Sequence, residues 1–488
     1  MFGPKVFFAA PMMAFLMCGT AQAALTADKV WADLQSTAVA NGLTLTVTAE
    51  VAGDRELTLN GVTVAPTGKP AIATIFDLSI VEQEDGSVAF FPGAIALLNT
   101  APSVIKIDHE ELSVSAFEDA GGLGYGIDAD SLKIDVTMVD GETLFAGVFD
   151  LTNLGGRYLR GREALGVDMS VERLVYDIKQ KDPALQIDSA QISDTADMAV
   201  TGTITLPQGL DLMSLQTTAA FAAAVRAGLG LDLEASQGAS KGTLSDTNPL
   251  MPISAMFTAA PGVTTVVANV DAFAVSTSVE GLDVRLSPPN LPVPVTVKTG
   301  AVALGMSSPI VAADEAGAFG FDMKLENLVF DDAAWSLIDP AAVLDRTPID
   351  LALALGGKAK LDVLDLMVSD ETGTPPRVMP QAQSLDITTL AVKALGAVAT
   401  GSGAFTFDNS MVAFGGPPLP VGTADVRLEG GNKVIDALIK LGVITAEDAM
   451  GARMMMAMFG QPAGDDVLTS KIEAREGGSI FVNGQQIQ

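Results

Sequence analysis

The chain has 488 residues, with 59 acidic against 28 basic side chains, and its formal net charge at pH 7 is −31. A charge of this sign repels nucleic-acid phosphates and anionic membrane surfaces, so a nucleic-acid partner is not expected. Hydrophobic residues make up 48% of the chain and its mean hydropathy is +0.37, which excludes intrinsic disorder.

The N-terminus has the pattern of a secretory signal peptide. Lys5 precedes an apolar run from Val6 to Met17, and Ala21-Gln22-Ala23 is a small-x-small cleavage site. The run is too short for a transmembrane span, and no later stretch qualifies as one. We therefore expect a cleaved signal peptide over residues 1–23 and a periplasmic mature chain over residues 24–488.

Cleavage after residue 23 would remove the only cysteine, Cys18, so that the mature chain would have neither a disulfide nor a reactive thiol. The alternative is a lipoprotein acylated at Cys18. Met17 disfavours it, because a lipoprotein signal needs a small side chain at that position.

The mature chain opens with an expected helix over residues 26–42. Thr26 is its N-cap, Val30, Trp31 and Leu34 share one face, and Gly42 ends it. Residues 45–64 then read as strand, glycine turn, strand, and Asn60-Gly61 indicates a further hairpin turn. The C-terminal residues 469–487 have the same order, with a final β-hairpin at Asn483-Gly484.

Period-two alternation dominates the middle of the chain. Apolar and polar residues alternate over Ile75–Ile80 and again over Val88–Phe90, and the residues Glu84–Ser87 between them form a predicted turn. The same alternation recurs at 174–187 and 321–325. Short β-favouring runs punctuated by Gly, Asn and Asp are typical of antiparallel strands joined by tight turns. We expect a mainly β fold: one elongated domain over 24–488, formed by a strongly curved, groove-like antiparallel sheet with a few short helices.

Three more helical segments are expected after the first. One covers about 211–227, and one begins with Asp339 as cap and Pro340 in the first helical position. The last is a C-terminal helical hairpin formed by 432–442 and 445–460, in which Thr445 and Asp448 have capping-box spacing.

The sequence contains no complete catalytic motif of a serine hydrolase. Gly238–Gly242 matches the G-x-S-x-G pattern around Ser240, but the base histidine should follow the serine and the only histidine, His109, precedes it. His109 lies among acidic residues in an expected turn, without a second histidine or cysteine to complete a metal site. We therefore expect no enzyme activity, no metal and no cofactor.

The segment from residue 331 to 362 resembles a signature of the secreted proteobacterial family named domain of unknown function 2125. The matching residues are Trp335, Asp339, Pro340, Leu344, Arg346 and Pro348, and the C-terminal end is also similar. Residues 390–407 more distantly resemble strand pairs of periplasmic AsmA-type β-groove proteins. The resemblance implies a fold and no catalytic residues, and we interpret the motif residues as structural.

A dense methionine cluster lies in the last helix. Met450, Met454 and Met458 share one face beside a row formed by Met455 and Phe459. Methionine fills irregular apolar surfaces, so we expect this face to pack against the sheet end; contact with an apolar ligand or partner, and a Cu(I) site, are the alternatives.

Two functions remain open from the sequence. The first is a periplasmic module whose apolar concave face binds or conveys a lipid or another apolar ligand. The second is a structural or protein-interaction component of the cell envelope whose interior is filled by its own side chains. An open apolar face would favour the first.

Overall fold

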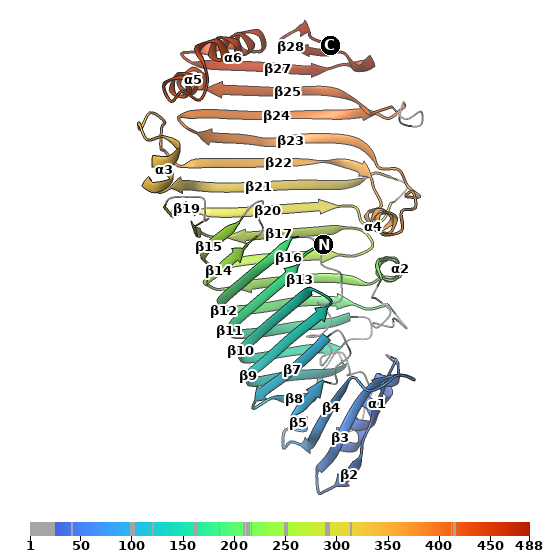
Figure 1. The fold of residues 1–488 in the computed structure, drawn as a ribbon. Helices are drawn as coiled ribbons and strands as arrows, with labels where there is room; N and C mark the ends of the chain where they lie inside the picture. The colour runs from blue at the N-terminus through green and yellow to red at the C-terminus, as the bar shows by residue number, and fades with distance from the viewer. Residues whose placement is uncertain are drawn as a thin grey trace. The chain divides into compact units, whose positions relative to one another are not determined.

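The computed structural model describes residues 25–40, 42–97, 103–119, 122–160, 164–184, 186–207, 210, 215, 217–247, 252–287, 293–312, 315–410, 412 and 416–488. The fold is mainly β, with one large antiparallel sheet and short helices, as the alternation predicts (Figure 1). Contacts divide the chain into two compact units, residues 1–256 and 257–488. We describe each unit by itself.

Unit 1 is built almost entirely from hairpin-connected strands. Its strands are β1 (Leu43–Thr46), β2 (Ala49–Ala52), β3 (Glu56–Pro66), β4 (Ala73–Glu82), β5 (Val88–Pro92), β6 (Ile95–Leu97), β7 (Ser103–Glu110), β8 (Ser113–Asp119), β9 (Gly122–Asp140), β10 (Thr143–Arg160), β11 (Ala164–Asp182), β12 (Ile187–Thr205), β13 (Gly230–Gln237) and β14 (Ser240–Asp246). The boundary with unit 2 falls within β15 (Ile253–Ala259). Short strands pair two at a time with one long neighbour: β7 and β8 both pair with β9.

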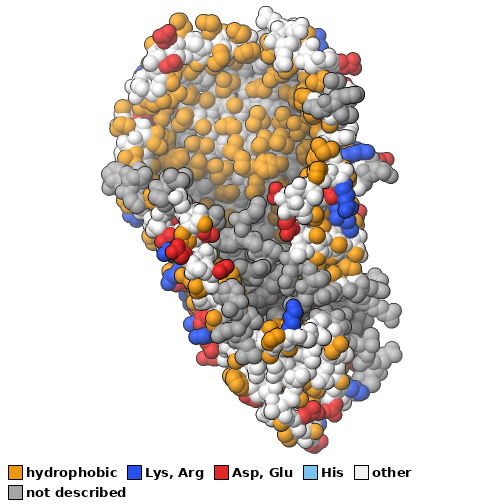
Figure 2. Space-filling model, turned by 45° about the vertical axis from the view of Figure 1, so that its right-hand side comes forward, with side chains coloured by type: hydrophobic (Ala, Val, Ile, Leu, Met, Phe, Trp, Pro, Cys, Tyr) orange, Lys and Arg blue, Asp and Glu red, His pale blue; other side chains and the backbone are white. Residues whose placement is uncertain are grey.

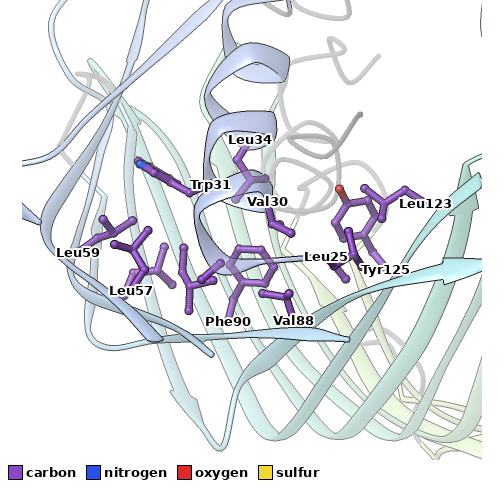
Figure 3. Close-up of a cluster of buried hydrophobic side chains, with 14 of the residues drawn as sticks. Leu25, Val30, Trp31, Leu34, Leu57, Leu59, Val88, Phe90, Leu123 and Tyr125 are labelled. Atoms are coloured by element: carbon purple, nitrogen blue, oxygen red, sulfur yellow. The ribbon is translucent and has the colours of Figure 1, made fainter. Parts of the chain in front are cut away.

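Helix α1 (Ala27–Ala40) covers the apolar side chains of β3, β5 and β9 (Figure 3). Its Val30, Trp31 and Leu34 are buried and belong to one hydrophobic cluster with Leu57 and Phe90 of the sheet. The helix thus matches the expected segment and apolar face, and its end is followed by Gly42 with a φ of +73°. Helix α2 (Thr218–Arg226) is shorter than expected, and residues 211–214 and 216 lie outside the described residues.

The longest strands of unit 1 keep one apolar face although their alternation changes phase. In β10, Leu151 and Leu154 pack in the same cluster, whereas residues three apart in a regular strand point to opposite faces. Asn153 lies between them with a φ of +49°, a left-handed conformation that Asn tolerates. The register with β9 is the same on both sides, Leu151 opposite Leu132 and Leu154 opposite Ala129. A single left-handed residue therefore resets the alternation without a register shift.

Unit 2 continues the same construction. Its strands are β16 (Gly262–Ala268), β17 (Phe273–Val279), β18 (Leu282–Leu286), β19 (Val295–Thr299), β20 (Ala301–Ser308), β21 (Gly317–Phe330), β22 (Ile349–Lys360), β23 (Gln381–Ala394), β24 (Ala397–Asp408), β25 (Leu419–Glu429), β26 (Gln461–Gly464), β27 (Val467–Ala474), β28 (Ile480–Val482) and β29 (Gln485–Gln486). From β20 to β25 each strand pairs with the next in the chain, and β25 then pairs with β27.

The helices of unit 2 are α3 (Asp332–Ile338), α4 (Val363–Thr372), α5 (Gly431–Lys440) and α6 (Ala446–Phe459). The predicted capping box of α6 is present: Thr445 Oγ1 accepts from the Asp448 N–H at 3.1 Å, and Asp448 Oδ2 accepts from the Thr445 N–H at 3.1 Å. Helix α4 was not expected. It begins at Asp362, whose side chain accepts from the Asp365 N–H at 2.7 Å.

One turn prediction is wrong and its counterpart is confirmed. Asn60-Gly61 lies inside β3, which pairs with β2 on one side of this position and with β1 on the other, so Gly61 bends a continuous strand. Asn483-Gly484 joins β28 to β29 as a two-residue hairpin turn with both φ angles positive.

Candidate functional site: an uncovered apolar face

The register of unit 2 aligns apolar residues into three transverse rows on one face of β20–β25 and β27. The rows are Val302, Leu325, Leu351, Val392, Ala399, Leu428 and Leu468; Leu304, Met323, Leu353, Leu390, Gly401, Val426 and Ser470; and Met306, Phe321, Leu355, Ile387, Gly403, Ala424 and Ile472. Directly opposite residues of antiparallel strands point to the same side. We call this set the apolar face; Ser470 is its one polar member.

The opposite side of the same strands is charged. Asp322 and Lys324 of β21 alternate with Phe321 and Met323, and Lys324 Nζ lies 2.6 Å from the Glu326 carboxylate. Ion pairs on that side also join neighbouring strands, as between Lys393 Nζ and Asp350 Oδ2 at 3.5 Å. The sheet is therefore amphipathic across its thickness, which explains how a chain with mean hydropathy +0.37 carries so many charges.

The apolar face is not covered like the core of unit 1. Leu351, Leu353 and Leu355 are half-buried, and Leu304 and Met306 are 43% and 46% exposed. Figure 2 shows the corresponding part of the molecule as a hollowed surface, and the described side chains that line it there are hydrophobic. The apolar side of the sheet is thus its concave side.

Small residues line the concave side of β24. A Cβ added to Gly403 would lie 2.7 Å from the Ala424 Cβ, and one added to Gly401 would lie 3.3 Å from the Leu390 Cδ2. Neighbouring strands therefore approach more closely here than side chains would allow, which favours bending of the sheet toward this face.

The family-motif residues form a compact structural cluster elsewhere in unit 2. The Trp335 ring is buried, makes an edge contact with Phe330 at 5.8 Å, and lies under the Arg346 guanidinium at 5.3 Å. Arg346 Nη2 donates to the Asp339 carbonyl at 3.0 Å. Leu344 is buried.

Asp339 does not begin a helix, contrary to the sequence prediction. Helix α3 is capped by Asp331 and ends before Asp339, and the segment from exposed Pro340 to half-buried Pro348 is irregular. The Asp339 carboxylate instead accepts from the N–H groups of Val343 and Leu344, both at 2.9 Å. The side chain thus accepts hydrogen bonds from backbone N–H groups, as a helix N-cap would, but these bonds close a turn and do not begin a helix.

The electrostatics of Asp339 reflect these contacts. Burial is the largest influence on the pKa of this carboxyl and would raise it; the hydrogen bonds from Val343 and Leu344 and the nearby Arg346 together outweigh it and lower the pKa. A fully buried carboxylate with these partners holds its turn in place and has no free oxygen directed at a ligand.

The methionine face does not pack against the sheet, and that prediction is wrong. Met450, Met454, Met455 and Met458 are 57–63% exposed and Phe459 is 37% exposed. Helix α6 packs through its other side. The Cβ position of Gly431 in α5 lies 3.3 Å from the Met456 sulfur, and Ala449 is buried.

The two catalytic candidates lie apart in unit 1. His109 is near the end of β7, where its Nε2 lies 3.0 Å from the Gly93 carbonyl oxygen. Ser240 is the first residue of β14, opposite Thr195 of β12. Within the described ranges no group of three His, Cys, Asp or Glu could hold a metal ion, and no helix is long and apolar enough to span a membrane.

Comparison of the chain with family models, curated proteins and solved structures finds no match. The resemblance of residues 331–362 to domain of unknown function 2125 therefore stays a prediction.

Proposed function

We propose that unit 2 binds a lipid or a similar hydrocarbon ligand on its apolar face, in the periplasm after export of the chain. The observation that carries the proposal is the half-exposure of aliphatic side chains in the three rows of β20–β25 and β27. A protein that filled its own interior would bury these side chains, so their exposure favours the binding function over a purely structural role.

The dimensions support a chain-like ligand. The three rows lie about 7 Å apart along the strands, and the seven adjacent strands that they cross are about 30 Å wide, so the face covers roughly 600 Å². The largest apolar patch on a typical soluble monomer is roughly 300–600 Å². The face offers no charged group, and Ser470 is the only side chain in the rows able to hydrogen-bond, so recognition rests on hydrocarbon contact.

Two measurements test the proposal. The protein purified from the envelope fraction is extracted with organic solvent, and lipids in the extract are quantified by mass spectrometry. Separately, a fluorescent fatty acid is titrated into the parent protein and into the variants Leu353→Gln and Ala354→Gln. The two substituted residues are neighbours in β22 that point to opposite faces of the sheet.

We expect a stoichiometric lipid in the extract. We expect Leu353→Gln to weaken binding of the fluorescent fatty acid by roughly tenfold while Ala354→Gln leaves it unchanged, because only the first places an unpaired amide against hydrocarbon. Equal affinity of both variants, or no saturable binding by the parent protein, would contradict the proposal and favour a structural role in the envelope.

A further inference from the structure

Helix α6 carries four methionine side chains on the side that faces water. Met450, Met454, Met455 and Met458 are each 57–63% exposed. At about 3.6 residues per turn they share an arc of about 140° around the helix axis. These side chains are therefore open to dissolved molecules that react with a thioether. We call the four residues the α6 methionines.

The opposite side of α6 holds the helix in place. Ala449 is 1% exposed, and Arg453 Nε donates to Asn432 Oδ1 at 3.2 Å. The Met456 sulfur lies 3.3 Å from the Cβ position of Gly431 on α5. Ala449, Arg453 and Met456 lie within about 60° of one another around the helix axis, away from the α6 methionines. One helix therefore carries methionines in two environments, four in water and one against α5.

A thioether reacts with peroxides and hypohalous acids by oxygen transfer. With hydrogen peroxide the sulfur gains one oxygen atom and loses two electrons, and the peroxide is reduced to water: R₂S + H₂O₂ → R₂SO + H₂O. At an exposed position the polar sulfoxide is hydrated and displaces no packing contact, whereas at Met456 it would enter the contact with α5. Hydrogen peroxide is uncharged, so the formal net charge of −31 does not repel it.

Other methionines of unit 2 have more to lose from oxidation. Met306 and Met323 belong to the apolar face, where a sulfoxide would place an unpaired polar oxygen among aliphatic side chains. Met306 is 46% exposed, so the same oxidants reach it. Each oxidant molecule that is consumed at α6 is one that does not reach the apolar face.

We propose that α6 is an oxidant-scavenging site, at which the α6 methionines take up oxygen from peroxides and hypohalous acids while the fold of unit 2 is unchanged. The sulfoxides stand in water on a folded helix, so a methionine sulfoxide reductase reaches and reduces them, and the site is used repeatedly. The benefit to ligand binding on the apolar face rests on the proposed function, whereas the reactivity of α6 does not.

Peptide mapping by mass spectrometry tests the reactivity. The full chain is treated with increasing hydrogen peroxide, and the sulfoxide at each methionine is measured together with the melting temperature. We expect the α6 methionines to oxidise roughly tenfold faster than Met456, without a change in melting temperature, and a methionine sulfoxide reductase to reverse their oxidation in the folded protein. Equal rates at Met456 and its neighbours, a melting temperature that falls as the α6 methionines oxidise, or sulfoxides that the reductase cannot reduce would overturn the proposal.

Leucine replacement tests the scavenging. One variant has leucine at all four α6 methionines, and the control is Met456→Leu, which removes the packed methionine of the same helix. Each protein receives one equivalent of hypochlorous acid, which is consumed completely (R₂S + HOCl → R₂SO + H⁺ + Cl⁻), and the sulfoxide at Met306 is measured.

The α6 methionines are four of the eight methionines that are more than a third exposed in the described part of the chain. We therefore expect the sulfoxide at Met306 to roughly double in the four-leucine variant and to stay unchanged in Met456→Leu. An unchanged sulfoxide at Met306 in the four-leucine variant, with folding confirmed by circular dichroism, would overturn the scavenging role. The readout is the sulfoxide and not ligand binding, so this result does not depend on whether the apolar face binds a lipid.

Discussion

A pair of leucine truncations measures whether the apolar face is open. Leu57 of β3 is 1% exposed beneath α1, whereas Leu353 of β22 is half-buried on the apolar face. Leu→Ala removes hydrocarbon worth about 2 kcal/mol in transfer free energy when the side chain is fully buried. At Leu57 a cavity forms as well, so we expect a loss of about 3–5 kcal/mol.

At Leu353 water already contacts part of the side chain and can enter the space that truncation leaves. No closed cavity forms, and the expected loss is about 1 kcal/mol. Urea unfolding followed by circular dichroism gives the free energy of unfolding of the parent and of each variant. The losses at Leu57 and Leu353 are compared only if the slope of this free energy against urea concentration is the same in all three proteins. A loss of 3 kcal/mol or more at Leu353 would show that the face is covered, and would refute the reasoning behind the proposed ligand site.

Two aspartates give opposite expectations for the pH dependence of stability. Burial raises the pKa of Asp33 on α1, so the stability that its protonated form contributes is lost as pH rises through the folded-state pKa. Asp33→Asn should therefore raise the melting temperature at about pH 7 and change it little at about pH 3; a lower melting temperature at pH 7 would show that the charged form is stabilising. The pKa of Asp339 is lowered by its hydrogen bonds and Arg346 against the effect of burial, so its contribution is present above the unfolded-state pKa and lost as pH falls. Asp339→Asn should lower the melting temperature at about pH 7 and converge with the parent in acid, and a constant difference across this range would contradict the assignment.

Local signals in the sequence predict elements where a single interaction decides them. The capping box at Thr445 and Asp448 is an interaction within one helical turn, and it forms as expected. Asn483-Gly484 forms a hairpin because the strands on both sides pair with each other. Asn60-Gly61 has the same chemistry, but the strands it was expected to join pair with other segments. The dipeptide permits a turn, and the pairing of distant strands decides whether one forms.

The sequence predicts which side chains share the apolar face, but it does not predict that this face is exposed. Alternation at Phe321, Met323 and Leu325 predicts which side chains share a face. Nothing in that alternation tells whether another layer covers them, because a strand facing a filled core has the same pattern. The prediction that the methionines of α6 pack against the sheet was wrong for the same reason. Periodicity places Met454 and Met458 on one side of the helix, but only the position of α5 determines which side faces water.

The pairing of unit 2 has a consequence for how it folds. From β20 to β25 each strand pairs with the preceding strand of the chain. Residues in contact are therefore close in sequence, and little chain entropy is lost when each connecting loop closes. Low sequence separation favours fast folding, and each hairpin presents a ready edge for the next. If the chain is exported N-terminus first, as we propose, it can therefore extend this sheet strand by strand, without waiting for its last residues.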